Sequence, residues 1–309
     1  MKNLKYAVIG SGAIGGFYGG KLANAGHDVH FLFHNDYDHV AKNGLSVDSV
    51  NGNFKILPIN AYHTTADMPT CDVVLVCLKT TQNHLLPDML PPLVAPGTCI
   101  IMIQNGLGME ADLATYFPNN GIMGAMAFIC SNKIGAGHIN HLDYGSLTLA
   151  NYRNTSATRI EQVAHDFTAA GIPVKIADNL LTARWRKLVW NIPYNGLSVV
   201  LHAQTDKLNA QPDTRQLLSD LMSEVIDAGN ACGANIPVSF ASEMIKSTDN
   251  MQPYSPSMLL DYERHQQMEI QYMYSNPIRS AAEYGFIMKK TEVLEQQLRY
   301  VDEGRNIKK

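Results

Sequence analysis

KYAVIGSGAIGG, residues 5–16, is the stretch that decides the fold of the first half of this 309-residue chain. A short apolar run leads into glycines at positions 10, 12 and 15, which fit the pattern GxGxxG. In this pattern the first glycine permits a tight turn, the second lets backbone amides approach a pyrophosphate, and the third allows close packing of a helix. A helix ending near Ala25–Gly26 and a strand at His27–Phe33 follow where a βαβ unit requires them. The sequence therefore predicts a dinucleotide site formed by Gly10, Ser11, Gly12, Ala13, Ile14 and Gly15.

The rest of the first half alternates β-like runs with turns or helices. The runs are HDVHFLF, CDVVLVCL, TCIIMIQNG and GIMGAMAFI, with briefer β-signals at SLTLANY and IPVKIA. Strands buried on both faces read as continuous apolar runs, so the pattern predicts a largely parallel sheet covered by helices. We therefore predict an α/β fold in which residues 1–178 form a Rossmann-type, doubly wound dinucleotide-binding domain.

From Asn179 onward the apolar periodicity is helical. Helices are expected over residues 180–200, 214–229, 238–246, 257–274 and 276–299, the last with a break at Tyr284–Gly285. No Pro-, Gly- or Ser-rich linker separates the halves, so we expect a tight joint with a cleft near 178/179. Residues 179–309 are predicted to form a second, all-helical domain for substrate and catalysis.

The composition excludes several classes of partner. A formal net charge of −4 leaves no excess of Lys or Arg for a nucleic acid or an anionic membrane surface, and no apolar stretch approaches the length of a membrane-spanning helix. The 11 histidines show no metal-ligand spacing, so no metal is expected. The 5 cysteines form no CxxC pair, which indicates reduced core residues and a cytoplasmic location.

The end of the second predicted strand bears on which dinucleotide is bound. An acid there binds a ribose 2′-hydroxyl and an Arg binds a 2′-phosphate, but this chain reads Phe33-His34-Asn35-Asp36. His34 can contact a 2′-phosphate, whereas Asp36 lies late for a ribose acid and fits better as the cap of a following helix. These residues favour NADPH and leave NAD open.

Two further segments end strands at the carboxyl edge of the predicted sheet, residues 77–82 and 104–108. Lys79 can hold a phosphate or a carboxylate there, or it can be solvated surface. Asn105 can anchor a nicotinamide ribose or a substrate carbonyl, or it can simply form a turn with Gly106.

A polar stripe crosses the first helix of the second half. Lys187, Asn191 and Asn195 stand four residues apart and share one helix face among apolar neighbours, which suits a cleft better than a solvated surface. The alternative is an exposed Lys with two surface amides. Pro193 lies within this helix and is expected to kink it.

A second stripe is expected on a helix that starts near Pro256. Its members recur every four residues and are Ser257, Asp261, His265 and Glu269. An acidic helix face is usually just solvated. Glu269, however, lies among Met268, Ile270 and Met273, where a buried carboxylate needs a cation or a donor.

Taken together, these motifs resemble the ketopantoate reductase family, the 2-dehydropantoate 2-reductases, over nearly the whole chain. The matching features are the GxGAxG start, the NGL-V segment at 43–47, Lys79 with Gln82, the QNG-G segment at 104–108, the WxKLxxNxxxN helix and the S-SMxxDxxR…E segment ending at Glu269. The resemblance implies an NADPH-dependent reduction of 2-dehydropantoate, a 2-keto acid, to pantoate in pantothenate biosynthesis.

The resemblance also implies residue roles. Lys187 would be the general acid that protonates the ketone oxygen, and Glu269 would hold the substrate hydroxyl and orient Lys187. A protonated Lys suits this task because it adds positive charge where negative charge develops. The expected substrate-positioning residues are Asn105, Asn191, Asn195 and Ser257. Beside the glycine motif, the expected cofactor residues are His34, Lys79, Gln82 and Asn105.

The chain departs from the family pattern at three places. His34 stands where an Arg is common, Asn195-Gly196-Leu197-Ser198 replaces N-P-L-T, and Met268-Glu269-Ile270-Gln271 with Tyr274-Ser275 replaces T-E-I-D with an N-G pair. The first change bears on the choice of cofactor, and the other two are expected to alter the pocket wall. They keep open a reductase of another small 2-keto acid or of a β-hydroxy acid and, from a different class, a non-catalytic NAD(P)-binding redox sensor. A homodimer is a further expectation.

Overall fold

The computed structural model describes residues 3–306, which contain one mixed sheet and a set of helices. The strands are β1 Lys5–Ile9, β2 Asp28–Leu32, β3 Leu45–Ser49, β4 Phe54–Ile56, β5 Asn60–Tyr62, β6 Val73–Val76, β7 Cys99–Met102, β8 Gly121–Gly135, β9 His138–Arg153 and β10 Val174–Ile176. The helices of the first half are α1 Ala13–Asn24, α2 Tyr37–Asn43, α3 Leu86–Met89, α4 Met109–Tyr116 and α5 Ala157–Ala169. Those of the second half are α6 Leu180–Leu201, α7 Thr205–Ala210, α8 Pro212–Ala231, α9 Phe240–Asp249, α10 Ser257–Glu263, α11 Asn276–Glu283 and α12 Lys289–Asn306.

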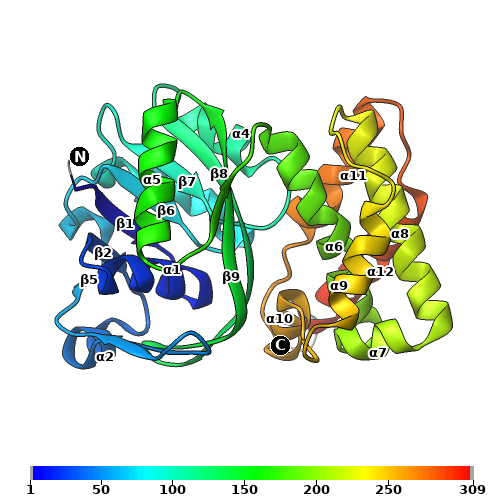
Figure 1. The fold of residues 1–309 in the computed structure, drawn as a ribbon, viewed down its shortest axis with the longest axis horizontal. Helices are drawn as coiled ribbons and strands as arrows, with labels where there is room; N and C mark the ends of the chain where they lie inside the picture. Colours follow the sequence, from blue (N-terminus) through cyan, green and yellow to red (C-terminus); the bar gives the residue numbers. More distant parts are fainter. Residues whose placement is uncertain (1–2, 307–309) are drawn as a thin grey trace. The chain divides into compact units, whose positions relative to one another are not determined.

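The central part of the sheet has the strand order of a dinucleotide-binding fold. The strands β5-β2-β1-β6-β7-β8 are neighbours in that order and all run parallel. Chain order therefore reverses beside β1, and the switch point between β1 and β6 is where such folds bind their ligand. Figure 1 shows α1 and α5 in front of this sheet and α4 behind it. The predicted Rossmann-type, doubly wound sheet is confirmed.

Beyond β8 the sheet turns antiparallel and curls. β8 pairs with β9 along a long hairpin that contains several register shifts, and β3, β4 and β10 extend the sheet past β9. The helix α1 packs against β3, β4, β8 and β9 as well as against β1 and β2, so the sheet wraps around it. The apolar runs predicted only the inner part of this hairpin, because the outer residues of β8 are partly exposed and carry polar side chains.

The second half is helical, as predicted, and each half has its own core. The helical core gathers around residues such as Trp185, Met222 and Tyr274, all 0% exposed. The chain divides into a sheet unit, residues 1–104 and 109–180, and a helical unit, residues 105–108 and 181–309. The sequence placed one boundary at 178/179; the short excursion at 105–108 was not foreseen. Within residues 3–306 no helix is long and apolar enough to cross a membrane.

One expected helix is wrong. Residues 257–274 do not form a continuous helix, because α10 ends at Glu263 and His265 takes a left-handed conformation with φ of 54°. The amide of Gln266 bonds the carbonyl of Asp261 at 2.8 Å, and the amide of His265 bonds that of Tyr262 at 3.2 Å. This is the Schellman pattern that ends a helix, usually built on glycine and here on His265.

Helical structure resumes in a π-helical turn at Gln271–Ser275, which leads directly into α11. Pro277 lies at the start of α11, and a proline removes one donor and crowds the preceding turn, so a wider turn accommodates it. The predicted break at Tyr284–Gly285 is confirmed, since α11 ends at Glu283 and Gly285 has φ of 80°.

Candidate functional site

The glycine turn after β1 is built as its sequence predicts. Gly10 has φ of 95°, and a Cβ there would lie 2.6 Å from the backbone nitrogen of Leu78, which follows β6. A Cβ on Gly15 would lie 2.3 Å from the carbonyl oxygen of Gly10. Both glycines are therefore needed for packing: the first joins the turn to the loop after β6, and the last brings α1 against the turn.

Gly12 differs from its two neighbours because nothing lies within 4 Å of the Cβ it lacks. It is the N-cap residue of α1, and no side chain caps the helix there. The neighbouring Ser11 hydroxyl instead donates to the carbonyl of Leu32 at 2.8 Å, tying the turn to the end of β2. The open space lies against the first amides of a helix, which carry partial positive charge, so the turn fits a pyrophosphate.

The end of β2 carries a small cluster of rings. His34 is exposed and stacks on His63, which follows β5, with centroids 6.0 Å apart; Tyr37 meets His63 edge-on at 5.4 Å. His63 was not recognised from the sequence, because only the pairing of β2 with β5 brings it beside His34.

The carboxylate of Asp36 is already engaged. It is 8% exposed, lies 2.6 Å from Nζ of Lys133 and accepts the amide of Gly137 at 2.9 Å. Asp36 does occupy the N-cap position of α2, but its side chain makes no capping bond there, so the expected cap is wrong. Its negative charge is compensated by Lys133 of β8.

The strand ends β6 and β7 place the other predicted cofactor residues. Lys79 is partly buried at the start of the turn Thr80–Leu85, and Gln82 is exposed within that turn. The side-chain nitrogen of buried Gln104, at the end of β7, donates to the Leu78 carbonyl and to Asn83 Oδ1, both at 2.7 Å. Gln104 thus fixes the loop that carries Lys79.

The predicted stripe on α6 is present, and its two asparagines differ in their hydrogen bonds. Asn191 and Asn195 are each 2% exposed, while Lys187 is partly buried. Asn195 Oδ1 accepts the Met258 amide at 3.1 Å and the Ser257 hydroxyl at 3.4 Å, and Asn195 Nδ2 donates to the Asn191 carbonyl at 3.0 Å. Asn195 therefore caps the N-terminus of α10.

Asn191 Nδ2 is the contrasting group. It is buried and has no hydrogen-bond partner among the residues that the structure describes. A buried donor without a hydrogen bond lowers the stability of the folded protein, so such a group is expected to bond a ligand.

Glu269 lies in the helical unit and is 8% exposed, just before the π-helical turn. The predicted stripe of Ser257, Asp261, His265 and Glu269 is wrong as one helix face, since α10 ends before His265. Ser257 is the first residue of α10, and Asp261 is buried at 4% exposure.

Two more buried polar residues of the helical unit were not singled out in the sequence. Arg184 is 2% exposed and lies one turn before Lys187 on α6, which a charged residue in an apolar helix could have signalled. Asn276 is 6% exposed and bonds the backbone at Leu107. In the sequence Asn276 was only the first residue of an expected helix.

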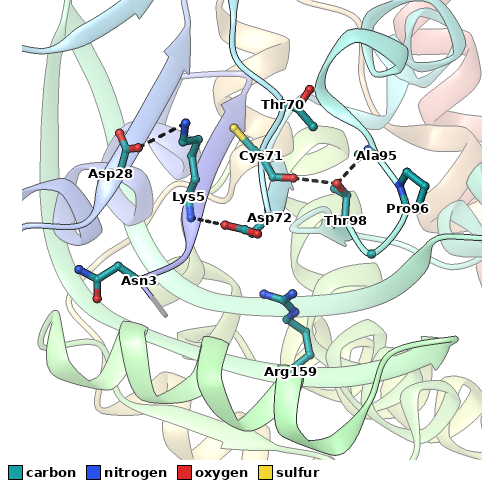
Figure 2. Close-up of a pocket in the computed structure, with 11 residues that line it drawn as sticks. Asn3, Lys5, Asp28, Thr70, Cys71, Asp72, Ala95, Pro96, Thr98 and Arg159 are labelled. Carbon is teal, nitrogen blue, oxygen red and sulfur yellow. Dashed lines mark hydrogen bonds and ion pairs between the residues drawn. The ribbon is translucent and has the colours of Figure 1, made fainter. Parts of the chain in front are cut away.

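A separate cavity of about 510 Å³ opens at the amino ends of β1, β6 and β7, the sheet edge opposite the glycine turn (Figure 2). Its charged side chains, Lys5, Asp28, Asp72 and Arg159, balance in sign. Burial raises the pKa of the Cys71 thiol to about 12, so this sulfur is a poor nucleophile. None of the predicted site residues lines it.

Comparison with known families matches both halves of the chain. A model described as ketopantoate reductase PanE/ApbA matches residues 6–154, and one described as ketopantoate reductase PanE/ApbA C terminal matches residues 179–302.

Individual relatives match over nearly their full length. A 2-dehydropantoate 2-reductase of Nostoc sp. is 48% identical, with 99% of this chain and 97% of the relative covered. The crystal structure of 2-dehydropantoate 2-reductase from Geobacter metallireducens is 39% identical with a TM-score of 0.93 and covers 96% of this chain and 99% of its own. That from Methylococcus capsulatus is 31% identical with a TM-score of 0.90 and covers 98% of both chains.

Proposed function

This chain belongs to the ketopantoate reductase family and is an oxidoreductase that uses a nicotinamide cofactor, and we propose that it reduces 2-dehydropantoate to pantoate with NADPH. The observation that carries the proposal is the α6 stripe: a partly buried Lys187 one turn from Asn191, whose buried amide nitrogen has no partner among the described residues. A 2-keto acid offers an acceptor for the Asn191 amide nitrogen and a ketone oxygen that Lys187 can protonate.

The glycine turn supports the cofactor half of the proposal. The open space at Gly12 and the uncapped start of α1 accommodate the pyrophosphate, and Lys79 and Gln82 follow the adjacent strand at the switch point. The reduced nicotinamide, when bound, supplies the hydride that reduces the ketone carbon.

Lys187 delivers the proton. Its ammonium donates to the ketone oxygen as that oxygen gains negative charge, and the C=O becomes CH–OH when both hydride and proton have been added. Glu269 accepts a hydrogen bond from the substrate hydroxyl and orients Lys187. In this scheme the carboxylate and the ammonium act as a pair, one positioning and one reacting.

The amides divide the remaining work. Asn191 Nδ2 donates to the substrate, because it is the amide nitrogen of the stripe without a protein partner among the described residues. Asn195 acts indirectly by holding Ser257 and the start of α10. Asn105 and Ser257 complete the contacts to the substrate or the nicotinamide ribose.

NADPH is favoured over NADH by the ring cluster at the end of β2. His34 and His63 stack at the end of β2, the strand end that contacts the ribose 2′-substituent in dinucleotide-binding folds, and the charge of the nearby Asp36 is offset by Lys133. The ion pair offsets the negative charge of Asp36, which would otherwise repel a phosphate.

The alternative substrate rested on altered residues in the segments 195–198 and 268–275, among them Gly196 and Tyr274. Tyr274 is 0% exposed and donates its hydroxyl to the Ile192 carbonyl at 2.9 Å, and a Cβ on Gly196 would lie 2.9 Å from the same hydroxyl. These two departures therefore lie against each other inside the helical core. Their burial there is consistent with 2-dehydropantoate as the substrate.

The test is the initial rate of NADPH oxidation by the purified protein with 2-dehydropantoate, beside 2-ketoisovalerate, pyruvate and other 2-keto acids. The highest kcat/KM with 2-dehydropantoate is expected. A higher value with another acid of the panel would assign the chain to that substrate, and no oxidation with any of them would favour the sensor.

A further inference from the structure

The segment Asn105–Gly108 connects β7 to α4, yet it packs with the helical unit. Leu107 belongs to the helical core and is 9% exposed. Gln104, the residue before the segment, is instead bonded inside the sheet unit to Leu78 and Asn83. The chain therefore changes units between residues 104 and 105 and returns between 108 and 109.

The π-helical turn supplies the first attachment. The amide of Asn276 bonds the carbonyl of Gln271, five residues earlier. The carbonyl of Tyr272 would next take the amide of residue 277, but Pro277 has none. That carbonyl accepts the amide of Leu107 at 2.9 Å instead.

The side chain of Asn276 supplies the second attachment. Its Nδ2 donates to the Leu107 carbonyl at 2.8 Å, and its Oδ1 accepts from Gln271 Nε2 at 2.9 Å and from an Arg279 guanidinium nitrogen at 3.0 Å. Both the backbone amide and the backbone carbonyl of Leu107 are thus bonded. The Asn276 side chain that bonds the carbonyl is itself held through its Oδ1.

The two glycines of the segment fit this contact. A Cβ on Gly106, whose φ is 112°, would lie 2.6 Å from the Tyr272 carbonyl oxygen. A Cβ on Gly108, whose φ is 97°, would lie 3.2 Å from Asn276 Nδ2. Glycine at both positions lets the segment approach the turn closely enough to bond.

We propose that Asn276 is a positioning residue of the reaction: together with the Tyr272 carbonyl, it clamps Leu107 and so holds Asn105 on the same unit as Lys187. The inference rests on the proposed function, which gives Asn105 a contact to substrate or nicotinamide ribose. Asn105 then keeps its place relative to Lys187 and Asn191, because all three belong to the helical unit.

The first test is a double-mutant cycle on kcat. Asn276→Ala is expected to lower kcat roughly 10- to 100-fold, since misplacing a positioning group by about 1 Å has effects of that order. If Asn276 acts through Asn105, adding Asn276→Ala to Asn105→Ala causes little further loss. Independent, multiplying losses would overturn the proposal.

The matched control is Asn209→Ala. Asn209 is also 6% exposed and its amide also bonds within the helical unit, to Tyr194 and Asp249. It is expected to lower Tm with kcat unchanged. An equal fall in kcat for both asparagines would reduce Asn276 to a general stabiliser.

A second variant covers the case in which Asn276→Ala fails to fold. Pro277→Ala restores an amide that competes for the Tyr272 carbonyl, so helix propensity improves while kcat falls and hydrogen exchange of peptides spanning 104–109 accelerates. Unchanged exchange and kcat would contradict the clamp. Hydrogen exchange can be measured without turnover, so the two proposals fail separately. If the wild type reduces no keto acid, the proposed function is wrong; if exchange is unchanged in an active enzyme, only the clamp is wrong.

Discussion

The glycine turn of the sheet unit and the α6 stripe of the helical unit, the two regions that we propose bind ligands, are built by opposite means. In the glycine turn the backbone does the work, and each position matters through the Cβ that is absent: two of these spaces are filled by protein and one is open. In the stripe the side chains do the work, and each amide matters through the partner it has or lacks. In neither region does the residue type by itself show what a residue does. In the glycine turn this depends on whether protein atoms fill the space beside the residue, and in the stripe on whether its amide has a hydrogen-bond partner.

The largest effect separates the glycines. Gly15→Ala is expected to unfold or strongly destabilise the sheet unit, because its Cβ would meet the Gly10 carbonyl oxygen at 2.3 Å. Gly12→Ala meets no protein atom within 4 Å, so it should keep Tm and weaken NADPH binding roughly 10-fold or more, by intruding where the pyrophosphate lies. Thermal melting and fluorescence titration measure both, and equal Tm values for the two variants would erase the distinction.

The next effect separates the asparagines of the stripe. Asn191→Ala should raise the KM for 2-dehydropantoate roughly 10-fold with little change in Tm, because it removes a donor that has no described protein partner. Asn195→Ala should instead destabilise the protein by about 1–2 kcal/mol, since the Met258 amide loses its cap. Steady-state kinetics and chemical denaturation decide; the reverse pattern would mean that the roles are exchanged.

A smaller effect concerns cofactor choice. His63→Ala should lower the preference for NADPH over NADH a few-fold, and His34→Arg should raise it by about 10-fold, because a guanidinium fork bonds a phosphate better than an imidazole does. The measurement is the ratio of the two kcat/KM values. If neither variant moves the ratio, the 2′-phosphate lies elsewhere.

The smallest effect is on stability and involves His141, which is 1% exposed. Burial lowers its pKa below the usual 6.5, and its Nε2 bonds the carbonyls of Asp143 and Tyr144. The folded state therefore favours the neutral ring, and stability present above about pH 6.5 is lost as the pH falls, because the unfolded chain takes up the proton more readily. Tm should drop by a few degrees more between pH 7.5 and pH 5.5 in the wild type than in His141→Gln; equal drops would contradict this assignment.

The sequence predicted the glycine turn well for a physical reason. Its geometry depends on six consecutive residues that join β1 to α1 and form the first turn of α1, and such local information is fully present in the chain. The Lys187 helix was predicted for the same reason, since residues four apart share a face wherever a helix forms.

The remainder depends on contacts between distant residues. His63 meets His34 only through the pairing of β2 with β5, and Asp36 is neutralised only because the β8–β9 hairpin brings Lys133 to it. The helix expected through His265 failed because a left-handed cap formed on a residue other than glycine. The role of Asn276 required the π-helical turn, which no apolar period announces.

The most direct test of the account is to measure turnover and NADPH affinity on one preparation of Lys187→Ala. Turnover of 2-dehydropantoate is expected to fall by roughly 10²- to 10⁴-fold, the usual contribution of a general acid, while the Kd for NADPH stays within about a factor of two. Near-normal turnover would remove Lys187 from the chemistry and contradict the proposed mechanism.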